Sequence, residues 1–465
     1  MAVKIKFMGG VRTVTGSSHM VISDLAKILL DVGLFQGKRD LAYQKNSHFS
    51  FNPRELDAVI LSHAHIDHCG NMPSLVKKGL RCKIYCTHAT RDLTKLMLED
   101  SGKIQDEDIR YVNKINKRLG LPLRKPLYTK LEASKAAKRR FVNISYGQRV
   151  CVAKNVFVTL HDAGHILGSS IVELEVKDGD KNIRIGYAVD LGRKNLPMLN
   201  DPDMPKNLDY LILESTYGGR DHAPIEEAKH KLRDAIKRTI ERKGKIIIPA
   251  FTLERTQEVL YFLSQLVKDK ELPALPIYVD SPLATEITEV FKYHHNYMNE
   301  QTRQEIDNGD SPFEFLNLRF VRDQKESKAL NVDRRPMVII AGSGMCESGR
   351  VLHHLRNNIE DSRNTVLVVG YMARDTLGRR IVEREKFVRI FGVEQELNAE
   401  VVIVNAFSAH ADKDELLELV GECLPLKKIF LVHGEEEQCQ ALWTALSQKG
   451  LDAYIPMPDE EVSLA

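Results

Sequence analysis

A short apolar run that leads directly into a cluster of metal-binding residue types most constrains the fold of this chain. Ala58–Leu61 is typical of a buried strand, and after one serine the chain continues as His63-Ala64-His65-Ile66-Asp67-His68. In an extended segment, side chains two residues apart point to the same side, so the first two histidines face one position. The aspartate and the last histidine face a second position as the chain turns away. The segment therefore predicts a strand end that presents ligands of the kind zinc prefers to two metal ions in a hydrolytic centre.

Two metal ions need more ligands than this segment supplies, and further candidates follow other expected strands. The three candidates are His165 after Val156–Leu160, Asp190 after Ile183–Val189, and His433 after Ile429–Val432. Loops that a rigid sheet holds in place are where catalytic groups are typically found. His161 competes with His165, and spacing alone does not choose between the two histidines.

Length and composition allow a multidomain enzyme and exclude several other classes. The chain has 465 residues, of which 43% are hydrophobic, enough for about two or three domains. A net charge of +3 provides no strong global field, so nucleic acid would need a local basic cleft. The seven cysteines lack C-x-x-C spacing, which argues against a disulfide framework and a zinc ribbon. Without a signal-peptide core or an apolar run of roughly 18 residues, we expect a cytoplasmic protein with no membrane span.

The apolar pattern divides the chain into parts with different expected secondary structure. From Lys4 to Val176, short β-type runs separated by Gly, Asn, Asp and Pro predict packed sheets. After Pro205 strands alternate with helices, beginning with Tyr210–Leu213, and this alternation predicts a parallel sheet flanked by helices. A last set of strands, Val401–Val404 and Ile429–Val432, again brings histidines to strand ends. The return of histidines predicts that an α/β domain is inserted into the first domain.

With these residues identified, the sequence resembles the metallo-β-lactamase superfamily over essentially its whole length. Residues 63 to 68 match the superfamily signature in residue type, and Asp31 matches its first motif. Ala163-Gly164-His165-Ile166-Leu167-Gly168-Ser169 matches the third motif and selects this histidine over its competitor. Asp190 matches the fourth motif, although Val189 stands where the family usually has glycine.

Three further motifs resemble the β-CASP branch of this superfamily, whose members are RNA-processing nucleases. Motif A contains Glu214, motif B contains His410, and motif C contains His433. The resemblance implies an α/β fold, a metallo-β-lactamase αββα sandwich with an inserted β-CASP domain built on a parallel sheet flanked by helices. The expected boundaries are 1–206 for the first part of the metallo-β-lactamase domain, 207–394 for the β-CASP domain and 395–465 for the second part.

The resemblance also implies that the chain binds two zinc ions, which acidify a water and stabilise charge during phosphoryl transfer. Seven residues with N or O donors are the expected ligands. One zinc ion would be held by His63, His65 and His165, the other by Asp67, His68 and His433, and both by Asp190.

The remaining roles implied by the resemblance concern proton transfer and support. Asp67, His410 and Glu214 are the expected catalytic residues. His410 is suited to give a proton to the leaving oxygen, and Glu214 would orient it. Asp31 is expected to hold the histidine-rich loop by hydrogen bonds.

Two loops of the inserted domain are expected to bind substrate phosphates. Gly342-Ser343-Gly344 follows one expected strand and Ser281-Pro282 follows another. Backbone N–H groups and hydroxyls at such turns can meet a nucleic-acid backbone. We therefore expect Ser281, Ser343 and Gly344 to contact substrate, an inference that depends on the family resemblance.

The function expected is that of a zinc-dependent endoribonuclease that cleaves single-stranded RNA and leaves 5′-phosphate and 3′-hydroxyl ends. A small-molecule hydrolase of the same superfamily is the first alternative, but it has no use for motifs A, B and C. A noncatalytic RNA-binding subunit is the second, and the retention of every ligand position argues against it. A 5′–3′ exonuclease or a DNA-directed nuclease stays open, although His433 in motif C favours RNA. A homodimer is also considered.

Overall fold

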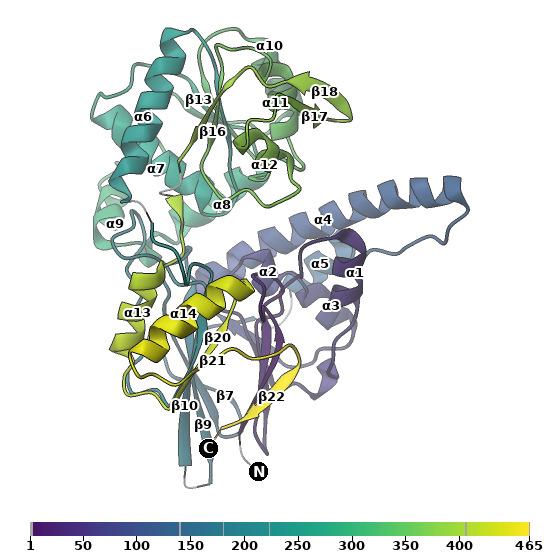
Figure 1. Cartoon of the computed structure of the whole chain (residues 1–465), viewed down its shortest axis with the longest axis vertical. Helices are drawn as coiled ribbons and strands as arrows, with labels where there is room; N and C mark the ends of the chain where they lie inside the picture. The colour runs from purple at the N-terminus through teal and green to yellow at the C-terminus, as the bar shows by residue number, and fades with distance from the viewer. Residues whose placement is uncertain (1–2, 139–140, 180, 223, 405–406, 465) are drawn as a thin grey trace. The chain divides into compact units, whose positions relative to one another are not determined.

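The computed structural model describes residues 3–138, 141–179, 181–222, 224–404 and 407–464, which form two compact units (Figure 1). Unit 1 comprises Met1–Asn195, Asn200–Asp221 and Ala409–Ala465. Unit 2 comprises Leu196–Leu199 and His222–Ser408. Most of unit 2 thus interrupts unit 1 in sequence, which confirms the expected insertion of one α/β domain into another.

Unit 1 contains two sheets of seven described strands each. In spatial order, the first sheet consists of β22 (Glu460–Ser463), β1 (Lys4–Gly9), β2 (Ser18–Ile22), β3 (Lys27–Leu30), β4 (Ala58–Ile60), β5 (Lys83–Cys86) and β6 (Phe141–Asn143). The second consists of β21 (Ala453–Tyr454), β20 (Lys428–Val432), β11 (Tyr210–Glu214), β10 (Lys181–Ala188), β9 (Ser170–Asp178), β8 (Val156–Asp162) and β7 (Val150–Ala153).

The two sheets pack face to face around one apolar core. Phe7 of β1 and Phe430 of β20 meet there, with ring centroids 5.1 Å apart. Along β20, Phe430 and Val432 enter this core, whereas Ile429 and Leu431 pack on the opposite face. Successive strand residues point to opposite faces, so a strand covered on both sides is apolar throughout.

Helices cover the outer face of each sheet, which confirms the αββα sandwich (Figure 1). Against the second sheet pack α13 (Lys413–Glu422) and α14 (Glu436–Gln448). Against the first pack α3 (Met72–Lys77), α4 (His88–Leu119) and α5 (Lys130–Ala137). The remaining helices of unit 1 are α1 (Arg39–Ser47), the 3-10 turn η1 (Pro53–Glu55) and α2 (Ile66–Cys69).

Unit 2 is built on a sheet whose six described strands are all parallel. Their order is β14 (Leu318–Phe320), β13 (Ile277–Val279), β15 (Val338–Ala341), β12 (Ile246–Pro249), β16 (Thr365–Val368) and β19 (Glu400–Ile403). A separate hairpin consists of β17 (Phe387–Ile390) and β18 (Val393–Glu396). The helices are α6 (Glu226–Glu241), α7 (Arg255–Lys268), α8 (Pro282–Tyr293), the 3-10 turn η2 (His295–Tyr297), α9 (Glu300–Asp307), α10 (Gln324–Val332), α11 (Val351–Asn358) and α12 (Leu377–Val382).

Two strands join different sheets from those the apolar pattern predicts. β11 was expected to open the parallel sheet of the inserted domain, but it pairs with β10 and β20 in unit 1. β19 was grouped with the returning part of the first domain, but it pairs with β16 in unit 2. An apolar run predicts that a strand exists, but it does not indicate which neighbour supplies the hydrogen bonds.

None of the helices in the described ranges combines the length and the apolar character that a bilayer span requires.

Candidate metal centre

The histidine-rich segment changes conformation where the sequence pattern predicts. After β4 the backbone stays extended as far as His65, with φ of −63° and ψ of 147°, and α2 then begins. His63 lies in the extended part, whereas Asp67 and His68 belong to the short helix. His63 and His68 are fully buried. The turn into a helix therefore separates two pairs of donors within six residues.

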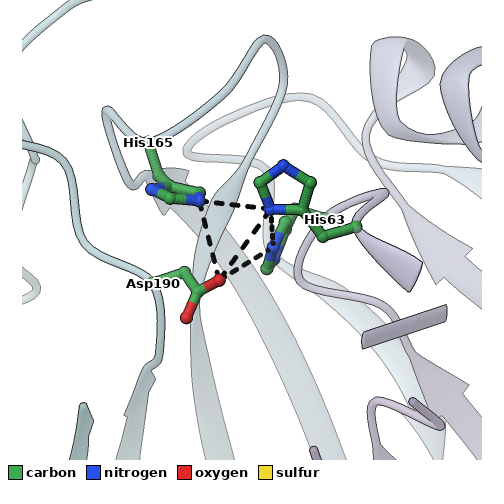
Figure 2. Close-up of side chains that lie close together, drawn as sticks. His63, His165 and Asp190 are labelled. Atoms are coloured by element: carbon green, nitrogen blue, oxygen red, sulfur yellow. Dashed lines mark hydrogen bonds and ion pairs between the residues drawn. The ribbon is translucent and has the colours of Figure 1, made fainter. Parts of the chain in front are cut away.

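Four side chains of unit 1 form a first group of converging donor atoms (Figure 2). Nε2 of His63 lies 3.1 Å from Nδ1 of His65 and 3.2 Å from Oδ2 of Asp190. Nε2 of His165 lies 3.3 Å from Nδ1 of His65 and 3.6 Å from the same Asp190 oxygen. The structure thus brings together four predicted site residues that come from three separate parts of the chain.

Asp67, His68 and His433 form a second group of donors next to Asp190. The Nε2 atoms of His68 and His433 are 3.2 Å apart, and Oδ2 of Asp67 lies 3.8 Å from Nε2 of His433. Oδ2 of Asp190 is 3.3 Å from Nε2 of His68, and its Oδ1 is 2.8 Å from Nδ1 of His433. Asp190 therefore contacts both groups, as a bridging ligand must.

Three residues of the cluster adopt the left-handed backbone region that side chains with a Cβ rarely enter. The φ values are 57° for Asp31, 53° for Asp190 and 48° for His433. Each residue directly follows a strand or lies within two residues of its end. Such conformations cost roughly 1–3 kcal/mol each and concentrate at functional sites. The sandwich stabilises three such conformations at one edge.

Asp31 does not join either donor group but accepts hydrogen bonds from the residues that do. Nδ1 of His68 donates to Oδ2 of Asp31 at 2.8 Å. Ser62 donates its backbone N–H to Oδ1 at 2.8 Å and its hydroxyl to Oδ2 at 2.7 Å. Nδ1 of His63 is 3.0 Å from the same hydroxyl. In this arrangement Nδ1 of each ring faces Asp31 or Ser62, so Nε2 is the nitrogen that faces the cluster.

Burial and charge divide the histidines into two electrostatic classes. Burial lowers the pKa of His63 to about 4 and lowers that of His165 well below its usual value, because a buried imidazolium loses hydration. Burial also opposes protonation of His433, but the Asp190 carboxylate outweighs it and raises this pKa to about 9. The same carboxylate raises the pKa of His68 above its usual value. His63 and His165 thus offer neutral lone pairs, whereas a cation that binds His68 and His433 must displace protons.

Glu214 and His410 form a pair beside the first group. Glu214 is fully buried at the end of β11, where its carboxylate accepts a hydrogen bond from the backbone of Leu191. Nδ1 of His410 donates to Oε2 of Glu214 at 3.2 Å. Burial lowers the pKa of His410, but the Glu214 charge outweighs burial and raises it. The His410 ring centroid is 4.6 Å from that of His165, so the pair adjoins the donor atoms.

The structure also places the remaining candidates. His161 belongs to neither donor group, and its Nε2 lies 3.0 Å from Glu173 instead. Ser281, Ser343 and Gly344 lie in unit 2, at the carboxyl edge of its parallel sheet. The oxygen of Ser281 caps α8 by accepting from Ala284 N.

Two supporting residues were not predicted from the sequence. Ser62 connects His63 to Asp31, and the Tyr187 hydroxyl donates to Asp31 at 2.9 Å. Ser62 directly precedes the histidine-rich segment, so its position was a usable signal. Tyr187 looks like an ordinary apolar residue of β10, and only the pairing of the two sheets brings it to Asp31.

The Asp31 network yields a test of ligand orientation. Asp31→Asn replaces an acceptor oxygen with a donor that faces other donors, so His63 and His68 lose their fixed orientation. We expect zinc, added as the probe, to bind about 10- to 100-fold more weakly. Competition with a chelating dye measures this affinity, and Asp57→Asn, which alters an exposed carboxylate bound to Lys27 N, serves as the control. Equal affinity in Asp31→Asn and the original chain would contradict the role assigned to Asp31.

Models of three domain families match the chain. The metallo-beta-lactamase superfamily domain matches residues 20–209, and the Beta-Casp domain matches residues 256–381. The Zn-dependent metallo-hydrolase RNA specificity domain matches residues 394–456. A crystal structure of a protein of unknown function from Enterococcus faecalis V583 covers 100% of both chains with a TM-score of 0.59 and 13% identity, which supports the fold alone.

Curated relatives align with the chain over nearly its full length. Ribonuclease TTHA0252 of Thermus thermophilus is 37% identical over 460 residues, covering 98% of this chain and 97% of the relative. Transcription termination factor FttA of Methanocaldococcus jannaschii is 31% identical, covering 94% of this chain and 68% of the relative. These identities and the domain matches show that the chain belongs to the β-CASP nucleases of the metallo-β-lactamase superfamily, a family of metal-dependent hydrolases.

Proposed function

We propose that this protein is a zinc-dependent ribonuclease that cleaves single-stranded RNA in the cytoplasm, as an endonuclease of RNA processing or decay. The observation that carries the proposal is the Glu214–His410 pair beside a seven-residue donor cluster. Hydrolysis of a phosphodiester needs both a metal site and a proton donor for the leaving oxygen. Relatives named as a ribonuclease and as a transcription termination factor point to the same class of substrate.

Donor spacing supports zinc as the metal. Ligand bonds of about 2.0–2.2 Å in a tetrahedron place neighbouring donor atoms roughly 3.3 Å apart. The contacts among His63, His65, His165 and Asp190 include distances of 3.1, 3.2, 3.3, 3.6 and 4.0 Å, and the first four lie close to this spacing. We assign this group to one zinc ion, and assign Asp67, His68 and His433 to a second ion that shares Asp190.

The protein side chains then divide the work of hydrolysis. Bound zinc supplies an acidified water and positive charge near the phosphate. Attack of water on phosphorus breaks the bond to the 3′ oxygen and leaves a 5′-phosphate and a 3′-hydroxyl. His410 gives its proton to the departing oxygen, and the Glu214 carboxylate raises the pKa of His410, which favours the protonated form that a proton donor needs. A small-molecule hydrolase with a better leaving group has less need of such a donor.

Product mapping tests the substrate class. We expect 5′-labelled single-stranded RNA to be cut internally, and a DNA of matched sequence to stay intact. Asp67→Ala/His68→Ala removes two proposed ligands and is expected to abolish cleavage. A matched control is Asp307→Ala/His295→Ala, which removes an exposed ion pair of unit 2. Equal cleavage of RNA and DNA, or cleavage by the ligand-deficient variant, would refute the proposal.

The pH profile tests the proton donor. A general acid must be protonated, so kcat falls as pH rises through the pKa of His410. Glu214→Gln removes the charge that raises this pKa, and we expect the basic limb to move down by about 1–3 pH units. Glu173→Gln, which alters the separate Glu173–His161 pair, is expected to leave the limb in place. If the basic limb of the pH profile does not move in Glu214→Gln, His410 is not the proton donor.

We also propose that two copies pair through the outer half of α4. Ile104, Tyr111, Ile115 and Leu119 are 38–66% exposed and recur on one face of the helix. Exposed apolar side chains that gather on one helix face support an interaction surface more than scattered ones do. An antiparallel pair that sets Ile104 opposite Ile115 of the partner subunit brings Glu107 near Lys114 of the partner subunit, twice by symmetry.

Charge reversal tests this pairing. Light scattering is expected to give twice the chain mass of 52.8 kDa. Glu107→Lys or Lys114→Glu alone sets like charges together and is expected to yield monomer, whereas the combined reversal restores the dimer. A monomeric original chain, or a dimer that ignores both single reversals, would overturn the α4 interface.

A further inference from the structure

Two exposed aromatic side chains stand at the carboxyl edge of the unit 2 sheet. Phe251 follows β12 and Tyr371 follows β16, and these two strands are parallel neighbours. Phe251 is 40% exposed and Tyr371 is 58% exposed. The carboxyl edge of a parallel sheet is where α/β domains bind ligands. An exposed aromatic ring at this edge therefore indicates a binding site more strongly than a single exposed apolar residue elsewhere on the surface does.

The ring of Phe251 rests directly on glycine backbone. A Cβ added at Gly344 would lie 2.8 Å from Cδ2 of this ring, and one added at Gly370 would lie 3.7 Å from its Cε2. Neither glycine has a positive φ, so space for the ring, and not backbone freedom, explains why a side chain is excluded at position 344. Glycine supports one side of the ring while leaving much of its surface exposed.

The backbone that carries Phe251 is also held in place. The carbonyl oxygen of Phe251 accepts hydrogen bonds from the Thr256 N–H at 3.1 Å and from the Thr256 hydroxyl at 2.7 Å. Glu254, three residues later, is buried with a φ of 67°. Bonds and strain within one loop indicate a fixed conformation at the start of α7. A fixed ring loses little freedom when a flat ligand covers it.

Hydroxyl groups that can meet phosphate lie in the same set of strand ends. Oγ of Ser281 is 3.8 Å from the position of a Cβ at Gly342, two residues before the glycine beneath the ring. Oγ of Ser343 accepts from the N–H groups of Glu347 and Ser348, which leaves its proton free to donate. A flat apolar face beside hydroxyl donors suits a nucleotide, which has a base and a phosphate.

We propose that Phe251 and Tyr371 form a base-stacking platform for single-stranded RNA on unit 2. This inference rests on the proposed ribonuclease function and adds the chemical group that these residues bind. Every nucleobase has a π face, so the platform accepts any sequence but requires unpaired bases. Duplex RNA, whose bases are stacked on each other, gains nothing from it.

The test separates base stacking from other contacts. Binding of fluorescent single-stranded RNA is measured with the full chain carrying Asp67→Ala/His68→Ala, so that the probe survives. Phe251→Ala is expected to weaken binding by about 5- to 150-fold, the range for loss of one stacked base. Phe251→Trp retains the stacking face and is expected to bind as before. Phe387→Ala, which removes a comparably exposed ring from β17, is the matched control.

An abasic probe identifies the contact. In a series of RNA probes, a single abasic nucleotide is placed at successive positions. The chain that carries only Asp67→Ala/His68→Ala is expected to bind the abasic probe more weakly than the intact probe at one or more of these positions. Phe251→Ala is expected to bind the abasic and intact probes alike. Gly344→Ala retains the Phe251 ring but displaces it, and is expected to weaken RNA binding as Phe251→Ala does.

Each other outcome has a distinct meaning. The platform is overturned if Phe251→Ala lowers the affinity for the intact probe and for the abasic probe by the same factor. It is also overturned if Phe251→Ala does not lower the affinity for RNA. Cleavage of RNA by the unaltered chain in that case leaves the ribonuclease function standing. Absence of RNA binding in every variant, together with absence of cleavage, removes the proposed function and the platform with it.

Discussion

The rest of the site depends on the contacts between one buried carboxylate, that of Asp190, and the histidine rings around it. Its Oδ2 lies between 3.2 and 4.0 Å from ring nitrogens of His63, His65, His68 and His165, and its Oδ1 is 2.8 Å from His433. The five imidazoles around it supply nitrogen atoms but no negative charge. A buried anion among them instead creates a place where positive charge is stabilised.

Packing of the two sheets of the sandwich holds the Asp190 carboxylate among these histidine rings. β4, β10 and β20 belong to two different sheets, and the residues that follow them meet at one edge. The shared apolar core, with Phe7 against Phe430, sets the separation of the sheets. Asp31 then orients two of the imidazoles through their Nδ1 atoms, His68 directly and His63 through Ser62. The placement of these candidate ligands is therefore a property of the packed fold and not of a flexible loop.

Local sequence pattern predicted the fold class and the cluster better than it predicted strand partners. The histidine-rich segment was informative because four donors fall within six residues at a strand end. Choosing His165 over His161 needed the family motif, and the Glu173 contact of His161 explains the choice physically. β11 and β19 were assigned to the wrong sheets because pairing depends on distant chain segments. Tyr187 escaped notice for the same reason.

Zinc-edge anomalous diffraction from crystals of the zinc-loaded chain tests the central claim most directly, because it locates the metal without relying on activity. The account predicts two peaks, one on each side of Asp190, within bonding distance of the His63–His65–His165 group and of the Asp67–His68–His433 group. Zinc peaks elsewhere with none at Asp190, or a single peak that engages only one group, would contradict it.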